Sequence, residues 1–331
     1  MLVFRHGLPC LIHVEHSGAT VLFRKKQFDE FVGHRFLNGE NFRYSNEMHS
    51  IIDLHTHSKA SDGDYSPAAL MQLARENHVS VLALTDHDTV AGDEKAREAA
   101  REGGIIFIPG VELSANWGQT CIHVVGLNVD TENPPLKDAC VRAARLRAER
   151  AEKIDARFKC LGIDHLLKDV KDIFPDVVNV SRAHFARALI RRAVVKNEQE
   201  AFDRFLGTQG PAYVPTGWPE LSDAIALISQ AGGVPVLAHP LRYRFASDLA
   251  GDALVEAFVT AGGQAIEGIS GSQIPQCSSR CAAWARKYGL FASTGSDFHR
   301  LSTVRPMLGH QPELPADLNC VTELLDLPKP Q

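Results

Sequence analysis

The chain lacks the features of a membrane, secreted or nucleic-acid-coating protein. No apolar run reaches the roughly 18 residues that a membrane-spanning helix needs, so we expect no membrane partner. No basic segment followed by an apolar run and a small-residue cleavage site opens the sequence, which argues against secretion. A formal net charge of −5 argues against a broad basic surface, although it leaves room for a local cationic pocket. We therefore expect a cytoplasmic protein.

Cysteine is sparse and without a pattern. The seven cysteines are odd in number and scattered, which fits a reducing compartment better than a disulfide framework. Histidine is abundant by contrast, with 15 residues, several of which lie at the ends of apolar runs. The composition suits an enzyme with a sizeable core, and nothing in it implies an obligate protein partner.

The sequence changes character four times. Residues 1–47 show no persistent period of 2 or 3.6, whereas the pattern becomes regular after Met48. We expect Met48 to be the biological start and the preceding stretch to be an upstream misannotation; the alternative is a genuine small extension that packs on the core. The predicted parts are an N-terminal extension 1–47, a first α/β part 48–130, a helical insertion 131–213, a second α/β part 214–310 and a C-terminal tail 311–331.

Strands and helices alternate in the first α/β part. The predicted elements are a helix from Ser66 to about Asn77, a strand Val79–Thr85, a helix Thr89–Glu102, and strands Ile105–Glu112 and Cys121–Leu127. Such alternation predicts an α/β fold with parallel strands, whose C-terminal ends carry the active groups.

The alternation stops at about Asn133 and resumes near Leu221. The intervening residues are helical and strongly charged, and we expect an inserted subdomain that covers the active face. Its arginine-rich run 141–158 is expected to be a solvated helix face rather than a phosphate grip. The second α/β part is predicted to contain helices Leu221–Ala231, 252–261 and 276–288 and strands Val234–Ala238, Ala265–Ile269 and Phe291–Gly295.

The apolar run at Ile51 ends in a His-x-His motif. Alternate side chains of a strand point the same way, so His55 and His57 face one point. Two neutral imidazoles that converge suit a first-row divalent metal. Taken alone, the motif is equally consistent with two hydrogen-bonded polar histidines, so the rest of the chain must decide.

Metal-capable residues recur at five further predicted strand ends. These are His87, Glu112, His123, His239 and the pair Asp297 and His299. Together with His55, His57 and Asp62 they make nine nitrogen and oxygen ligands without a cysteine. Nine ligands exceed the needs of one ion, so we expect two or three divalent ions that share bridging groups. Mixed imidazole and carboxylate ligands suit Mn²⁺, with Zn²⁺ or Fe²⁺ as alternatives.

The order of these motifs closely resembles the polymerase and histidinol phosphatase (PHP) family over about residues 50–310. The matching segments are His-x-His…Asp-Gly, Thr-Asp-His-Asp, Gly-Val-Glu, Ile-His, Ala-His-Pro and Ser-Asp-Phe-His. The resemblance implies a distorted (β/α)7 barrel with an inserted helical subdomain and a trinuclear metal site. The helical insertion, Ser181–Phe185 and Ala238–Tyr243 resemble a branch that contains nucleoside 3′,5′-bisphosphate phosphatases and 5′→3′ exoribonucleases.

The resemblance also implies how the ligands divide among the ions. It groups His55, His57, Glu112 and Asp297 around one ion, Glu112, His123 and His239 around a second, and Asp62, His87 and His299 around a third. Glu112 would bridge two ions, and Glu112, Asp297 and His299 are the residues expected to act in catalysis.

The implied activity is that of a phosphoric monoester hydrolase. A metal-activated water would remove the 3′-phosphate of a nucleoside 3′,5′-bisphosphate and leave a 5′-nucleotide. The alternatives are a 5′→3′ exoribonuclease on short 5′-phosphorylated RNA and a histidinol phosphatase. A non-catalytic PHP module and a C–N hydrolase are weaker alternatives. The expected partner is thus a nucleotide or a short oligoribonucleotide.

Three residues are predicted to bind substrate away from the metals: Arg182, His184 and Arg242. Arginine suits this role because its planar fork binds phosphate oxygens in pairs. The alternative for Arg182 is a salt bridge within the insertion.

Other residues near the motifs have two interpretations each. Trp117 could stack on a base or pack in the core. Asp86 and Asp88 could orient His87 from outside the ligand set. Asp88 is equally a candidate N-cap for the following helix.

Overall fold

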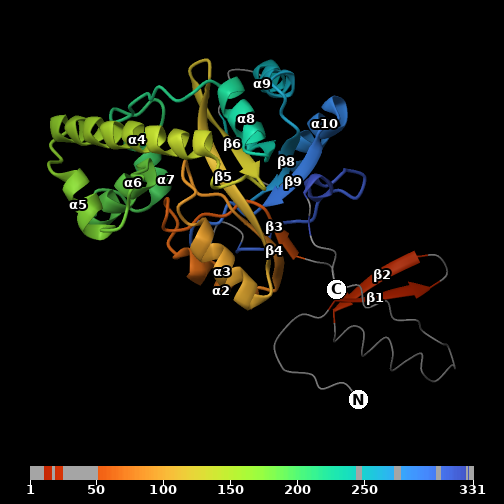
Figure 1. Ribbon diagram of the computed structural model, residues 1–331. Helices are drawn as coiled ribbons and strands as arrows, with labels where there is room; N and C mark the ends of the chain where they lie inside the picture. The colour runs from red at the N-terminus through yellow and green to blue at the C-terminus, as the bar shows by residue number, and fades with distance from the viewer. Residues whose placement is uncertain are drawn as a thin grey trace. The chain divides into compact units, whose positions relative to one another are not determined.

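A computed structural model describes residues 11–16, 19–24, 51–243, 248–271, 277–302, 307–325 and 327 (Figure 1). The chain divides into two compact units, Met1–His49 and Ser50–Gln331. In the first unit, β1 (Leu11–His16) and β2 (Ala19–Arg24) pair in antiparallel fashion. The rest of the predicted extension 1–47 lies outside the described residues, so the predicted start at Met48 stays a prediction.

The second unit is built on one seven-stranded sheet, whose strand order follows the chain. The strands are β3 (Ile51–Asp53), β4 (Val79–Leu84), β5 (Ile106–Trp117), β6 (Thr120–Leu127), β7 (Val234–Leu237), β8 (Ala265–Ser270) and β9 (Phe291–Gly295). The first and last strands meet where Leu54 N donates to Thr294 O at 3.0 Å. Beyond them, Thr56 and Phe298 form a parallel bridge. The sheet is thus nearly closed into a barrel, which confirms the predicted fold.

Helices cover the outside of the barrel (Figure 1). They are α2 (Pro67–Glu76), α3 (Asp93–Gly103), α8 (Leu221–Gln230), α9 (Asp248–Thr260) and α10 (Cys277–Tyr288). The first of them begins as predicted, with a proline in its first turn and the Ser66 hydroxyl accepting a hydrogen bond from Ala69 N. The strands are buried on both faces, between these helices and an apolar interior that includes Leu54, Val81 and Val236. This double burial explains their continuous apolar runs.

Parallel pairing, expected throughout, is wrong at β6. This strand runs antiparallel to both β5 and β7. Only Gly118 and Gln119 connect it to β5, and Gly118 has a positive φ of 59°. Because two residues can form a hairpin but not a crossover, the chain must reverse here. His123 therefore lies in the first half of its strand rather than at its end, and Glu112 lies in the middle of β5.

The segment between the two halves of the barrel is helical, as predicted. It contains α4 (Pro134–Cys160), α5 (Leu166–Ile173), α6 (Arg182–Arg191), α7 (Glu198–Ala201) and the π-helical turn η2 (Phe202–Leu206). These helices have a core of their own, in which Phe158, Phe185 and Leu206 are fully buried. Its exact boundaries as a domain stay a prediction. We call this segment the insertion.

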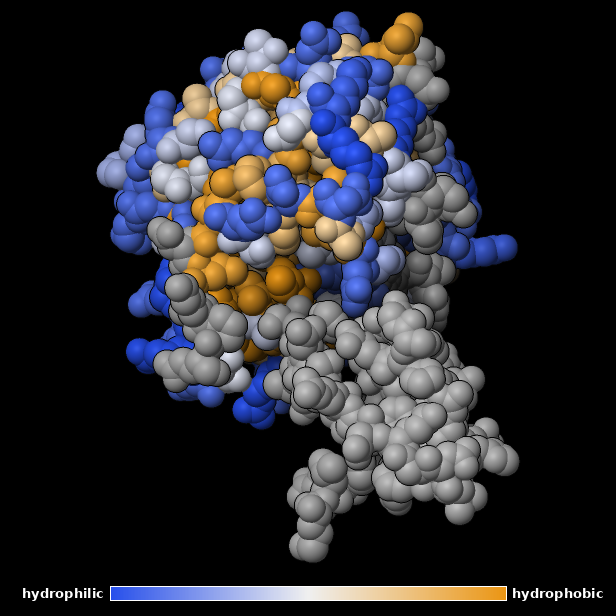
Figure 2. Space-filling view, turned by 90° about the vertical axis from the view of Figure 1, so that its right-hand side faces the viewer, coloured by the Kyte–Doolittle hydropathy of each residue, from blue (hydrophilic) through white to orange (hydrophobic). Residues whose placement is uncertain are grey.

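Two short helical turns complete the described elements. The turn η3 (Pro240–Arg242) follows β7, and η4 (Val321–Leu324) lies in the C-terminal tail. The tail packs on the barrel, where Asn319 O accepts a hydrogen bond from Ala292 N. On the face shown in Figure 2, hydrophobic side chains gather in the middle and lower part of the described surface, and hydrophilic side chains lie above and around them. Across the described residues, no helix has the length and apolar composition of a membrane span.

Candidate metal centre

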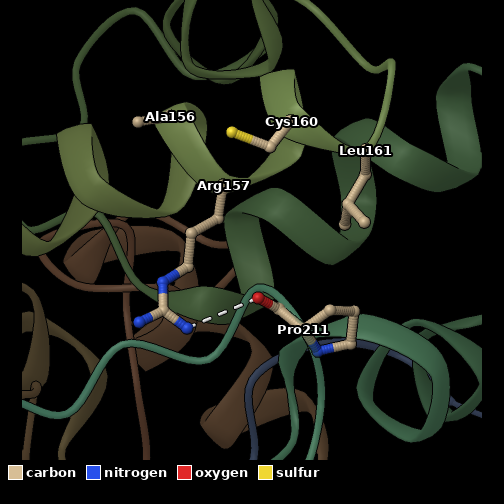
Figure 3. Close-up of a pocket in the computed structure, with 5 residues that line it drawn as sticks. All are labelled: Ala156, Arg157, Cys160, Leu161 and Pro211. Carbon is tan, nitrogen blue, oxygen red and sulfur yellow. Dashed lines mark hydrogen bonds between the residues drawn. The ribbon is translucent and has the colours of Figure 1, made fainter.

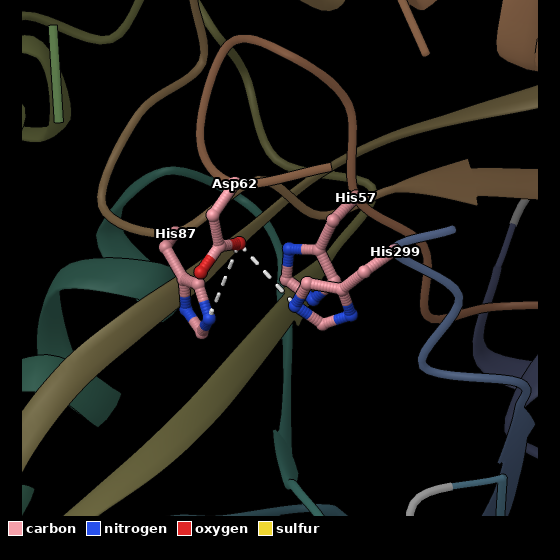
Figure 4. A group of neighbouring side chains, drawn as sticks. All are labelled: His57, Asp62, His87 and His299. Carbon is pink, nitrogen blue, oxygen red and sulfur yellow. Dashed lines mark ion pairs between the residues drawn. The ribbon is translucent and has the colours of Figure 1, made fainter. Parts of the chain in front are cut away.

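All nine predicted ligands lie together at one end of the barrel. Each belongs to at least one of four groups whose candidate ligand atoms lie within 4.8 Å of one another. The groups are His57, Asp62, His87 and His299 (Figure 4); His55, His57 and Asp297; His55, Glu112 and His239; and His87, Glu112 and His123. Shared members connect the groups, so the nine side chains form one cluster, which we call the metal cluster.

The buried carboxylate of Asp53 fixes the chain as it leaves β3. It accepts hydrogen bonds from the backbone N–H groups of His55, Ser296 and Gly309. Gly295 allows the last strand to approach, because a Cβ there would lie 2.4 Å from Cβ of His55. These contacts aim both imidazoles of the His-x-His motif into the barrel mouth.

Two cluster residues have left-handed backbones. His239 has a φ of 30° and Asp297 a φ of 51°. Such conformations cost about 1–3 kcal/mol for non-glycine residues and persist only where the surroundings impose them. These two residues lie at the turns that leave β7 and β9, where the left-handed backbone directs their side chains into the cluster.

Glu112 is the centre of the cluster and is fully buried. Its carboxylate oxygens lie near five imidazole nitrogens: His87 Nδ1 (2.8 Å), His123 Nδ1 (2.9 Å), His239 Nε2 (3.0 Å), His55 Nε2 (3.3 Å) and His57 Nε2 (3.3 Å). Burial alone would raise the pKa of Glu112, but the surrounding imidazoles hold it well below the usual range. Glu112 is therefore ionised at neutral pH, as a metal ligand must be.

The histidines differ in how readily they take up a proton. Burial lowers the pKa of His87 to about 4, which leaves a neutral ring with a free lone pair. Burial also disfavours charge on His123, but Glu112 and Cys121 outweigh it and raise the pKa to about 10. Protons and metal ions compete for the same nitrogen atoms, so the anionic field that attracts a proton to His123 also attracts a divalent cation.

The donor set fits divalent metal ions. Six imidazoles and three carboxylates supply only nitrogen and oxygen, and Nε2 of His55 faces Nε2 of His57 at 3.1 Å. Within the described residues, Oε2 of Glu112 makes no hydrogen bond, although three imidazole nitrogens lie within 3.3 Å of it. Buried polar atoms that protein groups leave unsatisfied, surrounded by further ligands, are the expected signature of a cation site.

Glu267 completes the site from outside the ligand set, and the sequence reading missed it. Its Oε1 lies 2.5 Å from Nδ1 of His55, and its Oε2 accepts a hydrogen bond from His239 N at 2.6 Å. The first contact turns Nε2 of His55 towards the cluster, as carboxylates commonly do for ligating imidazoles. A single acidic residue inside the apolar strand Ala265–Ile269 was the available signal.

Asp86 and Asp88 do not orient His87, contrary to expectation. Asp86 instead accepts hydrogen bonds from Ser58 and Ser61, which fixes the loop that presents Asp62. This loop also requires Gly63, where a Cβ would lie 2.3 Å from the carbonyl oxygen of His57.

Asp88 is not a helix N-cap either. Helix α3 begins only at Asp93, and Gly92 occupies the N-cap position. The carboxylate of Asp88 accepts hydrogen bonds from Ser114 and from Nε of Arg147 at 2.9 Å. Burial would raise its pKa, but the guanidinium beside it holds the pKa below the usual range. This ion pair joins the insertion to the barrel next to the metal cluster.

The predicted substrate residues lie in different surroundings. Arg242 is 43% exposed and its Nη1 donates to Asp297 at 3.2 Å, beside the metal cluster. Arg182 donates to Leu206 O, and its guanidinium lies 5.5 and 5.7 Å from the ring centroids of Phe202 and Tyr213. Among the described residues it has no carboxylate partner, so the alternative of a salt bridge within the insertion is wrong for it.

His184 and Trp117 are held by protein contacts. His184 is buried, and its Nδ1 accepts a hydrogen bond from Ser181 N to complete a capping box at the start of α6. Burial lowers its pKa to about 4. Its predicted contact with substrate stays a prediction. Trp117 ends β5 and packs partly against the core, in line with the packing interpretation.

The arginine run of α4 is only partly a solvated face. Arg147 and Arg150 are buried, and their guanidinium groups lie 5.2 and 5.3 Å from the ring centroid of Trp218. Arg142 and Arg145 are exposed, as expected. Arg157, nearer the end of the helix, donates to Pro211 O at 3.4 Å across a shallow hollow (Figure 3). The expectation is therefore wrong for the side of α4 that faces the barrel.

Comparison with known proteins links this site to one family. The PHP domain model matches residues 53–206. A 5′-3′ exoribonuclease of Haemophilus influenzae is 40% identical over 252 residues, covering 76% of this chain and 91% of the relative. A 3′,5′-nucleoside bisphosphate phosphatase of Chromobacterium violaceum is 38% identical over 264 residues, covering 80% of this chain and 92% of the relative.

Solved structures show the same fold. An amidohydrolase from Chromobacterium violaceum, with bound sulfate and no metal, has a TM-score of 0.80 and 36% identity. The match covers 84% of this chain and 96% of that one. A protein from Bifidobacterium adolescentis assigned as a metal-dependent phosphoesterase has a TM-score of 0.69 and 26% identity, with coverage of 82% and 93%. The chain is similar to each of these over nearly their whole lengths.

Proposed function

We propose, from the premise that the chain belongs to the PHP family of metal-dependent phosphoesterases, that its substrate is a nucleoside 3′,5′-bisphosphate. Hydrolysis of the 3′-phosphate would leave a 5′-nucleotide and inorganic phosphate. The observation that carries this proposal is the cluster of nine candidate ligands around Glu112, six of which are buried. The bisphosphate phosphatase that is 38% identical supports the choice of substrate.

The metal cluster would hold two or three divalent ions, and we propose Mn²⁺, with Zn²⁺ and Fe²⁺ as alternatives. Such ions supply a water of lowered pKa and neutralise charge on the phosphoryl oxygens. Glu112 links two of the four geometric groups, which supports its proposed bridging role. His57 belongs to the group of Asp62, His87 and His299 as well as to that of His55 and Asp297, so the grouping implied by the family is not the only one the geometry allows.

The protein side chains would position the substrate over this cluster. Asp297 and His299 come from the turn after β9, and His299 is 12% exposed at the edge of the cluster, where a phosphate could approach. We propose Arg182, His184 and Arg242 as substrate-binding residues. Arg242 has the most direct support, because its exposed guanidinium lies beside Asp297.

The test is phosphate release from four substrates with Mn²⁺. They are adenosine 3′,5′-bisphosphate, AMP, histidinol phosphate and a 5′-phosphorylated dinucleotide. Preference for the bisphosphate with AMP as product is the expected result, because only that substrate has a 3′-phosphate and a second phosphate to hold. Preference for histidinol phosphate, or no turnover of any substrate with metal bound, would overturn the proposal.

A 5′-3′ exoribonuclease is the second candidate, and the relative that is 40% identical favours it. The two activities share their chemistry. In both, water attacks a phosphorus atom attached to O3′ of a 5′-phosphorylated nucleotide, the P–O3′ bond breaks, and O3′ takes up a proton. They differ only in whether that phosphate carries a further nucleotide. Preference for the dinucleotide in the same assay would make the protein chiefly an exoribonuclease.

We also propose that the enzyme acts in the cytoplasm without an obligate protein partner. The scattered free cysteines support a reducing compartment. Cell fractionation and the activity of the purified chain alone would test these two statements.

A further inference from the structure

One of the four candidate metal-binding groups lies where the barrel meets the insertion. It consists of His57, Asp62, His87 and His299, and we call it the Asp62 group (Figure 4). Oδ1 of Asp62 lies 3.3 Å from Nε2 of His299 and 3.9 Å from Nε2 of His87. Within the described residues this buried oxygen makes no hydrogen bond. An ion shared by these side chains would satisfy it.

An arginine of the insertion holds the loop that carries Asp62. Arg187, on α6, donates through Nη2 to the carbonyl oxygen of Asp62 at 2.6 Å and through Nη1 to Oδ1 of Asp64 at 2.9 Å. One planar guanidinium thus joins the two residues on either side of Gly63. It also lies 5.3 Å from the ring centroid of Phe174, so packing as well as hydrogen bonds determines its position. Arg187 therefore restrains the backbone from which the Asp62 carboxylate projects.

The same guanidinium is linked to the segment that carries His299. Its Nε donates to Oε1 of Glu198 at 3.4 Å, and Glu198, at the start of α7, pairs with both terminal nitrogens of Arg300. Arg300 follows His299 directly, and the carbonyl oxygen of His299 accepts a hydrogen bond from Asp64 N at 2.7 Å. Bidentate pairs between arginine and a carboxylate restrict geometry as well as balance charge. The two segments are thus held to each other and to the insertion.

The insertion also contacts the backbone of His87. Asn179, a buried residue that precedes α6, donates through Nδ2 to the carbonyl oxygen of His87 at 3.2 Å. Contacts from the insertion therefore reach three members of the Asp62 group, at the ligand itself or at its neighbour in the chain. Other ligands are held by the barrel, where Glu267 of β8 contacts the ring of His55 and the backbone of His239. Different parts of the fold thus support different ligands.

We propose that Arg187 and Glu198 are positioning residues for the ion of the Asp62 group, so that affinity for this ion, and not for the others, depends on the insertion. The inference rests on the metal-binding part of the proposed function and is independent of the substrate. Asp64 is 46% exposed, Glu198 30% and Arg300 26%. Because ion pairs that water reaches contribute little to folding stability, the placement of ligand backbones explains this network better than stabilisation of the fold does.

Calorimetric titration of the metal-free full chain with Mn²⁺ tests the inference. In Arg187→Met we expect one ion to bind about 10- to 100-fold more weakly, the usual contribution of groups that hold metal ligands from outside the ligand set. The remaining ions should bind as in the wild-type chain. Arg187→Lys should lie between the two, because an ammonium group lacks the planar fork that joins two acceptors.

The matched control is Arg192→Met, which should leave every Mn²⁺ affinity unchanged. Arg192 also joins a carboxylate to carbonyl oxygens, those of Asp164 and His165, but all of these partners lie within the insertion. Glu198→Gln is a smaller change at a more exposed side chain. It should weaken the same ion, and it provides the test where Arg187→Met does not fold.

A double variant separates placement of the ligand from a general loosening of the chain. Asp62→Asn removes the ligand itself, so adding Arg187→Met should weaken Mn²⁺ binding by less than about threefold more, whereas independent effects would multiply. Full multiplication of the two effects, equal weakening of every ion, or an unchanged titration in both Arg187→Met and Glu198→Gln would overturn the inference. Each of these outcomes leaves the proposed function standing. Failure of the wild-type chain to bind Mn²⁺ would overturn both.

Discussion

The barrel and the insertion differ in how far their buried charged side chains are paired with groups of opposite charge. In the metal cluster, six histidines lie among three carboxylates, and the Glu112 carboxylate has imidazole nitrogens at 2.8 and 2.9 Å. In the insertion, the guanidinium groups of Arg150 and Arg182 face aromatic rings, and Arg182 donates to a single carbonyl oxygen, that of Leu206. The barrel thus balances its buried charges within itself, whereas Arg150 and Arg182 have no carboxylate partner among the described residues.

The largest effect should follow from Glu112→Gln, because Glu112 belongs to two of the four candidate metal-binding groups. The amide keeps the shape of the side chain but removes the charge that attracts the ions. We expect turnover of adenosine 3′,5′-bisphosphate to fall by about 10³-fold or more, beyond the roughly 10²- to 10³-fold that one electrostatic contact contributes. Phosphate release and metal content per chain would measure this, with circular dichroism as a check of the fold.

Activity within tenfold of wild type in Glu112→Gln would contradict the multinuclear mechanism. Because the ions would serve every substrate, Glu112→Gln should fail with the bisphosphate and with the 5′-phosphorylated dinucleotide alike.

The grouping of the metal-cluster residues was predictable because the ends of neighbouring strands bring residues from distant parts of the sequence together. His55 and Asp297 are far apart in the chain, yet each follows an apolar run, and neighbouring strands of a sheet bring such positions to one edge. His123 was identified for the wrong reason. An apolar run does not show in which direction its strand runs in the sheet. The sign that β6 runs antiparallel was the short turn at Gly118 and Gln119.

The buried arginines of α4 were harder to predict, because the faces of a helix must be inferred from the spacing of its residues. Arg147 and Arg150 lie on the same stripe of α4 as the buried residues Ala151, Ile154 and Phe158. The apolar members of that stripe mark it as a core face. The arginines within it were nonetheless attributed to solvent, because burial of a charged residue depends on partners such as Asp88 and Trp218 that no local pattern reveals.

The next effect in size concerns the contact between the two regions. Arg147→Met should remove the cation from its buried pair with Asp88 and leave the carboxylate uncompensated. Breaking a buried pair in this way costs about 3–5 kcal/mol of the free energy of unfolding. Denaturant unfolding would measure it, with Arg145→Met on the exposed side as the control. Equal stability of the two variants would show that the insertion is not held through this pair.

The smallest predicted effect tests whether the barrel cluster depends on support from outside the ligand set. Glu267 accepts from two donors at once, Nδ1–H of His55 and the backbone N–H of His239. In Glu267→Gln one of its two oxygens becomes an NH₂ group, so one of these donors faces another donor. Because carboxylates that hold ligating imidazoles typically contribute 10- to 100-fold, we expect metal affinity to fall by about that factor. Excess Mn²⁺ should then restore turnover. Glu256→Gln, exposed on α9, is the matched control. Loss of activity that added metal does not restore would instead mean that Glu267 takes part in catalysis itself.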